Sequence, residues 1–161
     1  MHNLLNTPTI LFDIDGTLAN IEHRVHFVSG KKKDFDAFNE AMVDDVPNKP
    51  IVALLNSLEH KYQIVFVTGR LERYREVTEK FLKRVRKAGS SSNLAQRFNL
   101  LMRPDDQRYI PDYEVKQKLL DEILTEIDKD NIVFAVDDRS RVVKMWRDND
   151  ITTLQVAEGN Y

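Results

Sequence analysis

The sequence predicts an α/β protein with a doubly wound, mainly parallel five-stranded sheet and a small insert after the first strand. Two observations predict this fold. Short apolar runs bounded by turn residues alternate with longer segments of helical periodicity. The short runs are also continuously apolar, which is typical of parallel strands covered by helices on both faces.

Each expected strand ends at a turn or at a polar motif. The five strands are residues 10–14, 62–67, 99–103, 131–136 and 151–156. The helices between them repeat apolar residues on one face, and they are residues 50–60, 71–87, 112–127 and 140–148. Residues 19–48 fit the alternation least, so we expect a hairpin-like flap there, with a short helix over residues 34–43. With right-handed crossovers, this order of elements describes a Rossmann-like sheet.

Length and composition predict one globular domain over residues 1–161. The chain is 42% hydrophobic and 31% charged, with 5 Gly and 5 Pro, which excludes disordered and fibrous classes. It has no cysteine, which excludes a disulfide framework, a thiolate zinc site and a cysteine nucleophile. No apolar run approaches the roughly 20 residues of a membrane span, and Met1 to Thr9 lacks the order of a signal peptide. We therefore expect no membrane association and a cytoplasmic location.

The strongest chemical signal is the string Asp13-Ile14-Asp15-Gly16-Thr17-Leu18, which places two carboxylates at the carboxyl end of the first strand. Ligands of open α/β sheets bind at that edge. Because unpaired buried carboxylates are costly, we infer that a cation or a proton transfer uses them. An Asp-Gly turn that merely ends the strand is the alternative, but the whole string is more specific than such a turn.

A second acidic pair, Asp137-Asp138, ends the fourth strand and is followed by Arg139. The first and fourth strands are neighbours across the switch point of such a sheet, so we expect both acidic ends in one crevice. Converging carboxylates repel each other unless a hard divalent cation neutralises them, and oxygen-only ligands favour Mg²⁺. The pair therefore predicts a Mg²⁺ site, with a helix N-cap at Asp138 as the alternative.

Two further polar motifs follow the intervening strands. Thr68-Gly69-Arg70 is expected to end the second strand and open a helix, where a hydroxyl and free backbone N–H groups can bind phosphate. Lys116 lies in the first turns of the helix after the third strand, with Asp112 one turn earlier to orient it. An ordinary helix cap and a solvated ion pair are the alternatives.

In this order, and over nearly the whole chain, the four motifs resemble those of the haloacid dehalogenase-like (HAD) phosphohydrolases. A closer resemblance is to the 3'-phosphatase domains of bacteriophage polynucleotide kinase/phosphatase. The residues that carry it are Arg24, Gln63-Ile64-Val65, Asp112, Asp137-Asp138-Arg139, Val142-Val143, Met145-Trp146-Arg147 and the run from Gln155 to Tyr161. The sequence has no G-x-x-x-x-G-K-[ST] motif, so we expect no kinase domain.

The resemblance implies a HAD-like fold and hydrolysis in two steps. Asp13 would be the nucleophile that forms an aspartyl-phosphate, and Asp15 the general acid and base, protonated when substrate binds. Thr68 and Lys116 would position and stabilise the transferring phosphoryl group. Mg²⁺ would be held by Asp13, the backbone carbonyl of Asp15, and Asp137 or Asp138. Substrate contacts would come from Arg24, Gly69, Arg70 and Asp112.

The leading hypothesis is therefore a Mg²⁺-dependent phosphatase acting on 3'-phosphate ends of DNA or RNA, or on nucleoside 3'-monophosphates. The insert before Pro47 looks too small for a closed lid, so we expect a site open to the end of a strand. The alternatives are a 5'(3')-nucleotidase or broad-specificity small-molecule phosphatase and, from another class, a non-catalytic module that binds nucleic-acid ends. If the chain is of phage origin, its compartment is the host cytoplasm.

The net charge of −2 is the sum of two unlike parts. Residues 61–108 carry 12 Lys/Arg and 5 Asp/Glu, a net +7, and the remainder carries 12 and 21, a net −9. Much of the basic excess lies on the helix after Arg70, where a polynucleotide backbone could run, although a solvated helix face is the alternative. Lys31-Lys32-Lys33 is interpreted as a solvated loop, with a phosphate contact as the alternative.

Overall fold

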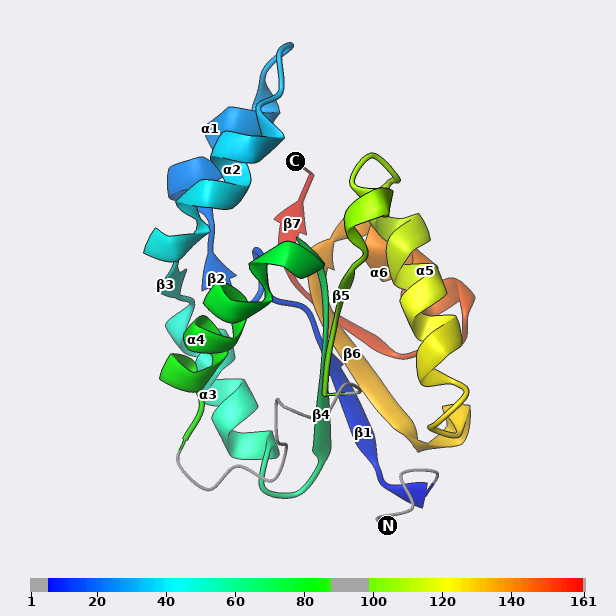
Figure 1. Cartoon of the computed structure of the whole chain (residues 1–161). Helices are drawn as coiled ribbons and strands as arrows, with labels where there is room; N and C mark the ends of the chain where they lie inside the picture. The colour runs from blue at the N-terminus through cyan, green and yellow to red at the C-terminus, as the bar shows by residue number, and fades with distance from the viewer. Residues whose placement is uncertain (1–5, 88–98, 161) are drawn as a thin grey trace.

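The computed structural model describes residues 6–87 and 99–160, and a five-stranded sheet forms its centre (Figure 1). The strands stand in the order β5-β4-β1-β6-β7. Their bounds are Thr9–Phe12 (β1), Gln63–Leu71 (β4), Leu100–Arg103 (β5), Ile132–Arg139 (β6) and Thr153–Gly159 (β7). All neighbouring pairs are parallel, so the carboxyl ends of the five strands lie at one edge of the sheet. The predicted doubly wound α/β fold is confirmed.

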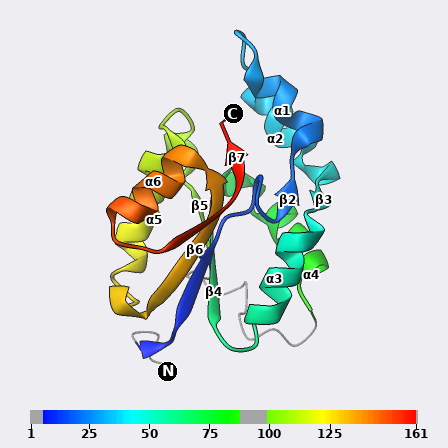
Figure 2. The same ribbon diagram turned by 180° about the vertical axis from the view of Figure 1, so that it is seen from behind.

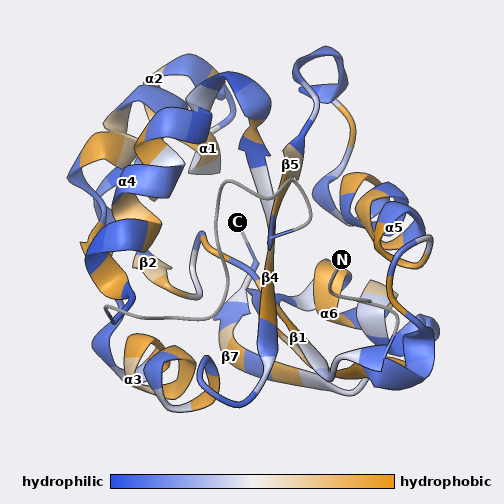
Figure 3. Cartoon of the chain, turned by 60° about the horizontal axis from the view of Figure 1, so that its bottom comes forward, coloured by the Kyte–Doolittle hydropathy of each residue, from blue (hydrophilic) through white to orange (hydrophobic). Residues whose placement is uncertain are grey.

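Helices cover both faces of the sheet (Figures 1 and 2). α3 (Lys49–Leu58) and α4 (Arg75–Val85) pack on one face, and α5 (Asp112–Ile123) and α6 (Ser140–Asp148) pack on the other. Figure 3 shows that β4, an interior strand between β5 and β1, is largely apolar, whereas the helices carry both polar and apolar residues. A strand in this position buries side chains on both faces, which explains its continuous apolar run.

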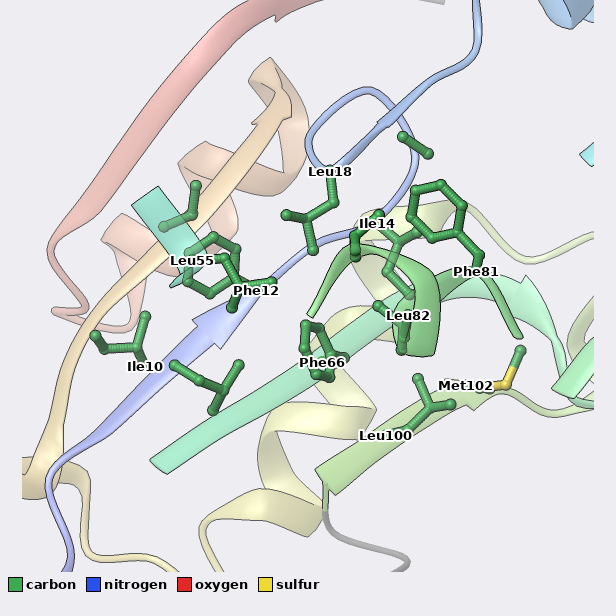
Figure 4. Packing of buried hydrophobic residues seen from close by; sticks show 14 of the residues in the cluster. Ile10, Phe12, Ile14, Leu18, Leu55, Phe66, Phe81, Leu82, Leu100 and Met102 are labelled. Atoms are coloured by element: carbon green, nitrogen blue, oxygen red, sulfur yellow. The ribbon is translucent and has the colours of Figure 1, made fainter. Parts of the chain in front are cut away.

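Successive side chains of each strand point to opposite faces and divide the core into two clusters. In β1, Ile10 and Phe12 join the cluster under α3 and α4, while Leu11 joins the one under α5 and α6. Figure 4 shows the first cluster, in which Phe12 and Phe66 of neighbouring strands lie on the same face as Leu82 of α4. These residues are fully buried or nearly so, so the strand ends that carry the polar motifs are held by a close-packed core.

An insert follows β1 and stands above the carboxyl ends of the strands (Figure 1). Its base is an antiparallel pair of β2 (Ala19–Asn20) and β3 (Val46–Pro47), as expected for a hairpin-like flap. Between them lie α1 (Glu22–Ser29), α2 (Phe35–Glu40) and a 3-10 turn, Ala41–Asp44. Residues 34–43 were expected to be helical, and α2 with the 3-10 turn covers them. The expectation of one helix was wrong: α1 has no apolar stripe to reveal it, because the side chains it buries are Arg24 and Val28.

Two strand ends differ from the prediction. β4 does not stop before Thr68-Gly69-Arg70 but runs on to Leu71, and α4 begins only at Arg75 after a 3-10 turn. The expectation that this motif opens a helix is therefore wrong, because the strand continues past an irregularity in its pairing with β5. β6 likewise runs through Arg139, which is the N-cap of α6 in place of Asp138.

Some expectations fall on residues outside the described part of the chain. They concern residues 1–5, where no signal peptide is expected, and Tyr161, the last residue of the C-terminal run. Within residues 6–87 and 99–160, no helix is long and apolar enough to cross a membrane.

Candidate active site

The turn after β1 directs its two carboxylates into different surroundings. The backbone N–H of Asp13 still donates to the carbonyl of Val136 on β6, at 3.0 Å. Gly16 then adopts a φ of 79°, in the left-handed region that favours glycine, and the chain turns back toward Ala19. As a result, the Asp13 carboxylate faces β6 and α5, whereas the Asp15 carboxylate faces β4 and the insert.

Three buried carboxylates and one ammonium group form the first cluster. Carboxylate oxygens of Asp13, Asp137 and Asp138 lie within 4.8 Å of one another. The Lys116 Nζ atom lies 2.7 Å from Asp13 Oδ1 and 2.9 Å from Asp137 Oδ2. The Thr17 hydroxyl donates to Asp13 Oδ2 at 2.9 Å. The structure thus brings the two predicted acidic strand ends and the predicted lysine together in one cluster.

The charges of this cluster do not balance without a cation. Burial raises the pKa of Asp13 well above its usual value, and Asp137 and Asp138 raise it further, while Lys116 opposes the shift. For Lys116, burial lowers the pKa, but Asp13 and Asp137 more than reverse this and leave it well above its usual range. With all three carboxylates ionised, the one ammonium group leaves an excess of two negative charges, which is consistent with the raised pKa of Asp13. An oxygen donor set with this excess fits a hard divalent cation such as Mg²⁺.

The second cluster joins the edge of the sheet at the carboxyl ends of the strands to the insert, through two arginines and two aspartates. Arg70 donates to Asp15 Oδ1 from Nη2 at 2.6 Å and to Asp45 Oδ2 at 2.6 Å. Arg24 donates to Asp15 Oδ1 at 2.8 Å and to both carboxylate oxygens of Asp45 at 2.7 Å. The side chains of Arg24, Arg70 and Asp45 are completely buried. Asp15 therefore directs its side chain away from the acidic cluster and toward the two arginines.

The two guanidinium groups hold Asp15 in its charged form. Burial by itself raises the pKa of Asp15, but Arg70 and Arg24 outweigh it and lower the pKa to about 2. Burial raises the pKa of Asp45, and Arg24 opposes that shift. At neutral pH the free protein therefore carries Asp15 as a carboxylate. The general-acid role expected for Asp15 requires the opposite, protonated form.

Gly69 and Asp112 meet at close range beside these clusters. A Cβ atom on Gly69 would lie 2.2 Å from Asp112 Oδ1, so a larger residue here would displace the Asp112 carboxylate. Arg103 links the two, donating to the Gly69 carbonyl at 2.9 Å and to Asp112 Oδ1 at 3.1 Å. Burial raises the pKa of Asp112, but Lys116, Arg139 and Arg103 outweigh it and lower the pKa. The Asp112 carboxylate lies 3.9 Å from Lys116 Nζ, farther than Asp13 and Asp137.

Thr68 is completely buried, and its Oγ1 atom accepts a hydrogen bond from the backbone N–H of Arg70 at 3.2 Å. This bond stabilises the irregular end of β4 that carries Gly69 and Arg70.

A cavity of about 110 Å³ opens between the two clusters. Asp13, Asp15, Gly69, Arg70, Asp112 and Arg139 line it from the sheet side. Phe35, Phe38 and Asn39 of the insert and Arg108 of the loop after β5 form the opposite wall. Arg108 Nη2 lies 2.6 Å from Asp36 Oδ1, which links this loop to the insert. Of the residues predicted to bind substrate, Gly69, Arg70 and Asp112 line the cavity, whereas Arg24 lies behind Asp15.

The sequence analysis did not identify Asp45, Thr17 or Arg103 as site residues. Thr17 belongs to the first motif, and Arg103 ends a strand at the same edge of the sheet, so both positions carried a signal. Asp45 lies in the insert outside any motif, and its partners are 21 and 25 residues away in the sequence. Trp146, named above only as part of the family resemblance, is buried and donates from Nε1 to Asp137 Oδ2 at 3.2 Å.

A parallel sheet with acidic ends on β1 and β6, a buried lysine beside them and a small polar cavity at this edge together define a phosphatase of the HAD-like class. Comparison with known proteins makes the assignment more specific. The chain belongs to the family described as the polynucleotide kinase PNKP phosphatase domain, which it matches over residues 7–161.

A curated relative points the same way. Over 148 residues, or 90% of the chain, the sequence is 30% identical to a protein of Autographa californica nuclear polyhedrosis virus described as a bifunctional polynucleotide kinase/RNA ligase. The chain covers 18% of that viral protein. The chain thus spans less than a fifth of this relative.

Solved structures share the fold. A chain of the Pnkp1/Rnl/Hen1 complex is 28% identical with a TM-score of 0.69, over 97% of this chain and 48% of that one. The class C acid phosphatase of Bacillus anthracis, with tungstate bound, has a TM-score of 0.65 at 17% identity, over 96% and 68% of the two chains. A HAD family enzyme of Bacteroides thetaiotaomicron, crystallised with magnesium and inorganic phosphate, has a TM-score of 0.54 at 14% identity, over 97% of each chain.

Proposed function

We propose that the chain is a Mg²⁺-dependent phosphatase that removes 3'-phosphates from the ends of nucleic-acid strands or from nucleoside 3'-monophosphates through an aspartyl-phosphate. One observation carries the reaction type: the buried Asp13 carboxylate is fixed by Lys116 and Thr17 beside a second acidic pair and lines the small cavity. Membership of the polynucleotide kinase phosphatase family supports the nucleic-acid substrate.

In the first step, an Asp13 carboxylate oxygen attacks phosphorus and the bond from phosphorus to the leaving oxygen breaks. Lys116 and Thr17 each hold an oxygen of Asp13, so the nucleophile has one orientation. Asp15 gives its proton to the leaving oxygen, which departs as a hydroxyl group. When bound by Asp13, the backbone carbonyl of Asp15, and Asp137 or Asp138, Mg²⁺ supplies charge stabilisation for the phosphoryl oxygens.

In the second step, the Asp15 carboxylate takes a proton from water, the water oxygen attacks phosphorus and the bond to Asp13 breaks. Inorganic phosphate is released, and both aspartates return to their ionised starting state once Asp15 gives up to solvent the proton that it took from water. Lys116 offsets part of the negative charge on Asp13 as it leaves.

The substrate itself provides the means to protonate Asp15. Arg70 lines the cavity and is a principal cause of the low pKa of Asp15. An arriving phosphate dianion adds negative charge next to Asp15 and shares the Arg70 guanidinium, so both effects raise the pKa of Asp15. Arg24 contacts Asp15 and Asp45 but does not line the cavity, so it acts on substrate only through Asp15.

The substrate contacts and catalytic groups in this proposal otherwise follow the family resemblance. Gly69 allows the backbone to pass close to the phosphate beside Asp112, which anchors Arg103 and Arg139 at the rim. Thr68 supports the same backbone from within the strand.

The proposed product also suits the activities named for the relatives. A nucleic-acid ligase joins a 3'-hydroxyl to a 5'-phosphate, and the viral relative is described as a polynucleotide kinase/RNA ligase. Removal of a 3'-phosphate supplies the 3'-hydroxyl that such a reaction consumes.

The test compares phosphate release from a 3'-phosphorylated oligonucleotide, a 5'-phosphorylated oligonucleotide and free 3'- and 5'-mononucleotides, with Mg²⁺ and with a chelator. We expect phosphate release from the 3'-phosphorylated substrates in the presence of Mg²⁺ but not of the chelator. The Asp13→Asn variant should lower the rate of this release at least a thousandfold. Asp121→Asn is the matched control, because this exposed carboxylate on α5 lies outside the cavity. No release from any substrate would refute the phosphatase, and preference for 5'-mononucleotides would refute the 3'-end assignment.

A further inference from the structure

The catalytic cavity is too small for the rest of a nucleotide substrate. Its volume of about 110 Å³ is well below the roughly 300–1,000 Å³ of sites that enclose whole small molecules. The reacting phosphate therefore occupies it alone, and the sugar, base and preceding phosphodiester of a strand lie outside.

The basic helix α4 offers few free cations for that strand. Arg73 pairs with Asp105 at 3.1 Å, Lys80 with Glu76 at 2.7 Å, and Arg75 with Glu72. Arg86 pairs with the buried Glu59, and Arg84 donates to the backbone carbonyl of Asp45. Local partners thus satisfy most of the positive charge that the sequence concentrates here, which favours the solvated-face interpretation of this helix.

A second hollow lies directly beside the catalytic cavity. It has a volume of about 500 Å³ and shares Asp112 and Arg139 with the catalytic cavity, so the two are contiguous. Its walls come from the first turns of α5 and α6, the end of β7 and Lys33 of the insert. In Figures 1 and 2 the end of β7 lies between the insert and the helices α5 and α6.

The chemistry of this hollow suits a phosphodiester and a base. Arg141 and Lys33 are exposed and line it from two sides. Asp112, the one carboxylate among the lining residues, is already opposed by Arg103, Arg139 and Lys116. Tyr113 contributes an aromatic ring of the kind on which unpaired bases stack.

We infer that the hollow between α5, α6 and β7 binds the single-stranded nucleotides that precede the 3'-phosphate, with Arg141 and Lys33 contacting their phosphodiester groups. The inference rests on the proposed function and adds to it the path of the strand. It makes the enzyme prefer an oligonucleotide to a mononucleotide, since only the oligonucleotide reaches these two cations. It also makes that preference depend on salt, because each phosphate contact on a single strand releases bound counterions.

The experiment measures kcat/KM on a nucleoside 3'-monophosphate and on 3'-phosphorylated single strands of two, four and eight nucleotides, over a range of salt concentrations. The variants are Arg141→Glu, Lys33→Glu and their combination. Lys118→Glu is the matched control, since it makes the same charge change at an exposed position of α5 outside the hollow. Binding of a labelled strand with a free 3'-hydroxyl is followed in parallel by fluorescence anisotropy.

We expect Arg141→Glu to lower the ratio of oligonucleotide to mononucleotide kcat/KM about tenfold and to flatten the salt dependence by about one unit of log-log slope. Lys118→Glu keeps the wild-type ratio and slope. Equal effects of Arg141→Glu and Lys118→Glu, or a ratio that neither variant changes, would overturn the inference while the phosphatase stands. A wild-type protein that hydrolyses no 3'-phosphate would overturn the proposed function. In that case, weaker strand binding by Arg141→Glu than by Lys118→Glu in the anisotropy assay would support binding in the hollow, and equal binding would overturn the inference as well.

Discussion

Asp45→Asn tests whether buried ion pairs hold the insert against the edge of the sheet at the carboxyl ends of the strands. Asp45 is completely buried and accepts hydrogen bonds from Arg24 on both oxygens and from Arg70 on one. Asparagine keeps one oxygen but turns an NH₂ group toward guanidinium donors. Two buried guanidinium groups would then share the single carboxylate of Asp15, which leaves one positive charge uncompensated.

The size of the effect follows from this loss. Removing one partner of a buried ion pair costs about 3–5 kcal/mol. For a chain of 150–250 residues each kcal/mol lowers Tm by about 2–4 °C, so Tm should fall by about 6–20 °C. The matched control is Glu76→Gln, which removes a carboxylate that pairs with Lys80 at 2.7 Å on the surface. This control should leave Tm within error of the wild type, because exposed pairs contribute little.

Differential scanning calorimetry and urea unfolding measure both variants. A double variant, Asp45→Asn with Arg24→Gln, removes the stranded charge and should cost less than the sum of the two single changes, by about 1–3 kcal/mol. If Asp45→Asn unfolds at the same temperature as Glu76→Gln, the buried network does not hold the insert and the reasoning fails.

Three further predictions concern the same edge. Because its two arginine partners lower the pKa of Asp15 from 3.8 to about 2, ionised Asp15 stabilises the fold at pH values above 3.8 by on the order of 2 kcal/mol, and this contribution is lost as pH falls toward about 2. Asp15→Asn should therefore flatten the dependence of the free energy of unfolding on pH between pH 4 and 2. An unchanged dependence would contradict the ion pairs. Gly69→Ala places a Cβ 2.2 Å from Asp112 Oδ1 and should reduce kcat/KM at least tenfold. The control Gly30→Ala, whose Cβ would have its nearest atom at 3.9 Å, should match the wild type. Equal activities of the two variants would show that the end of β4 and Asp112 can shift to accept a Cβ without loss of function. Mg²⁺ at a hundred times the wild-type Kd should stabilise the wild type by about 2.7 kcal/mol in thermal melts but not the double variant Asp137→Asn with Asp138→Asn, and equal stabilisation of both proteins would place the metal elsewhere.

The parts of this fold that the sequence predicts are those with a local signal. Continuous apolar runs mark the strands, and the acidic groups at the carboxyl ends of β1 and β6 meet because parallel neighbours present these ends together. The same rule brought Lys116 to the cluster, since the helix after β5 begins at that edge.

The parts that the sequence did not reveal depend on polar contacts between distant segments. α1 escaped prediction because Arg24 occupies its buried side and is satisfied by Asp45, 21 residues later. Likewise, the string Thr68-Gly69-Arg70 resembles a strand end, yet β4 continues through it. Helical periodicity is detected from the spacing of apolar residues alone, so it does not reveal a helix whose buried side carries an ion pair.

The network of Arg24, Asp45, Arg70 and Asp15 also limits how this phosphatase can be re-engineered. Inserts after the first strand are attractive units to exchange between related scaffolds when a new substrate is wanted. Here the insert supplies two of the four charged groups in a network that lowers the pKa of Asp15. A graft that replaces residues 19–48 must therefore supply an arginine and an aspartate positioned to contact Arg70 and Asp15. Without them, the new insert changes the pKa of Asp15 as well as the specificity.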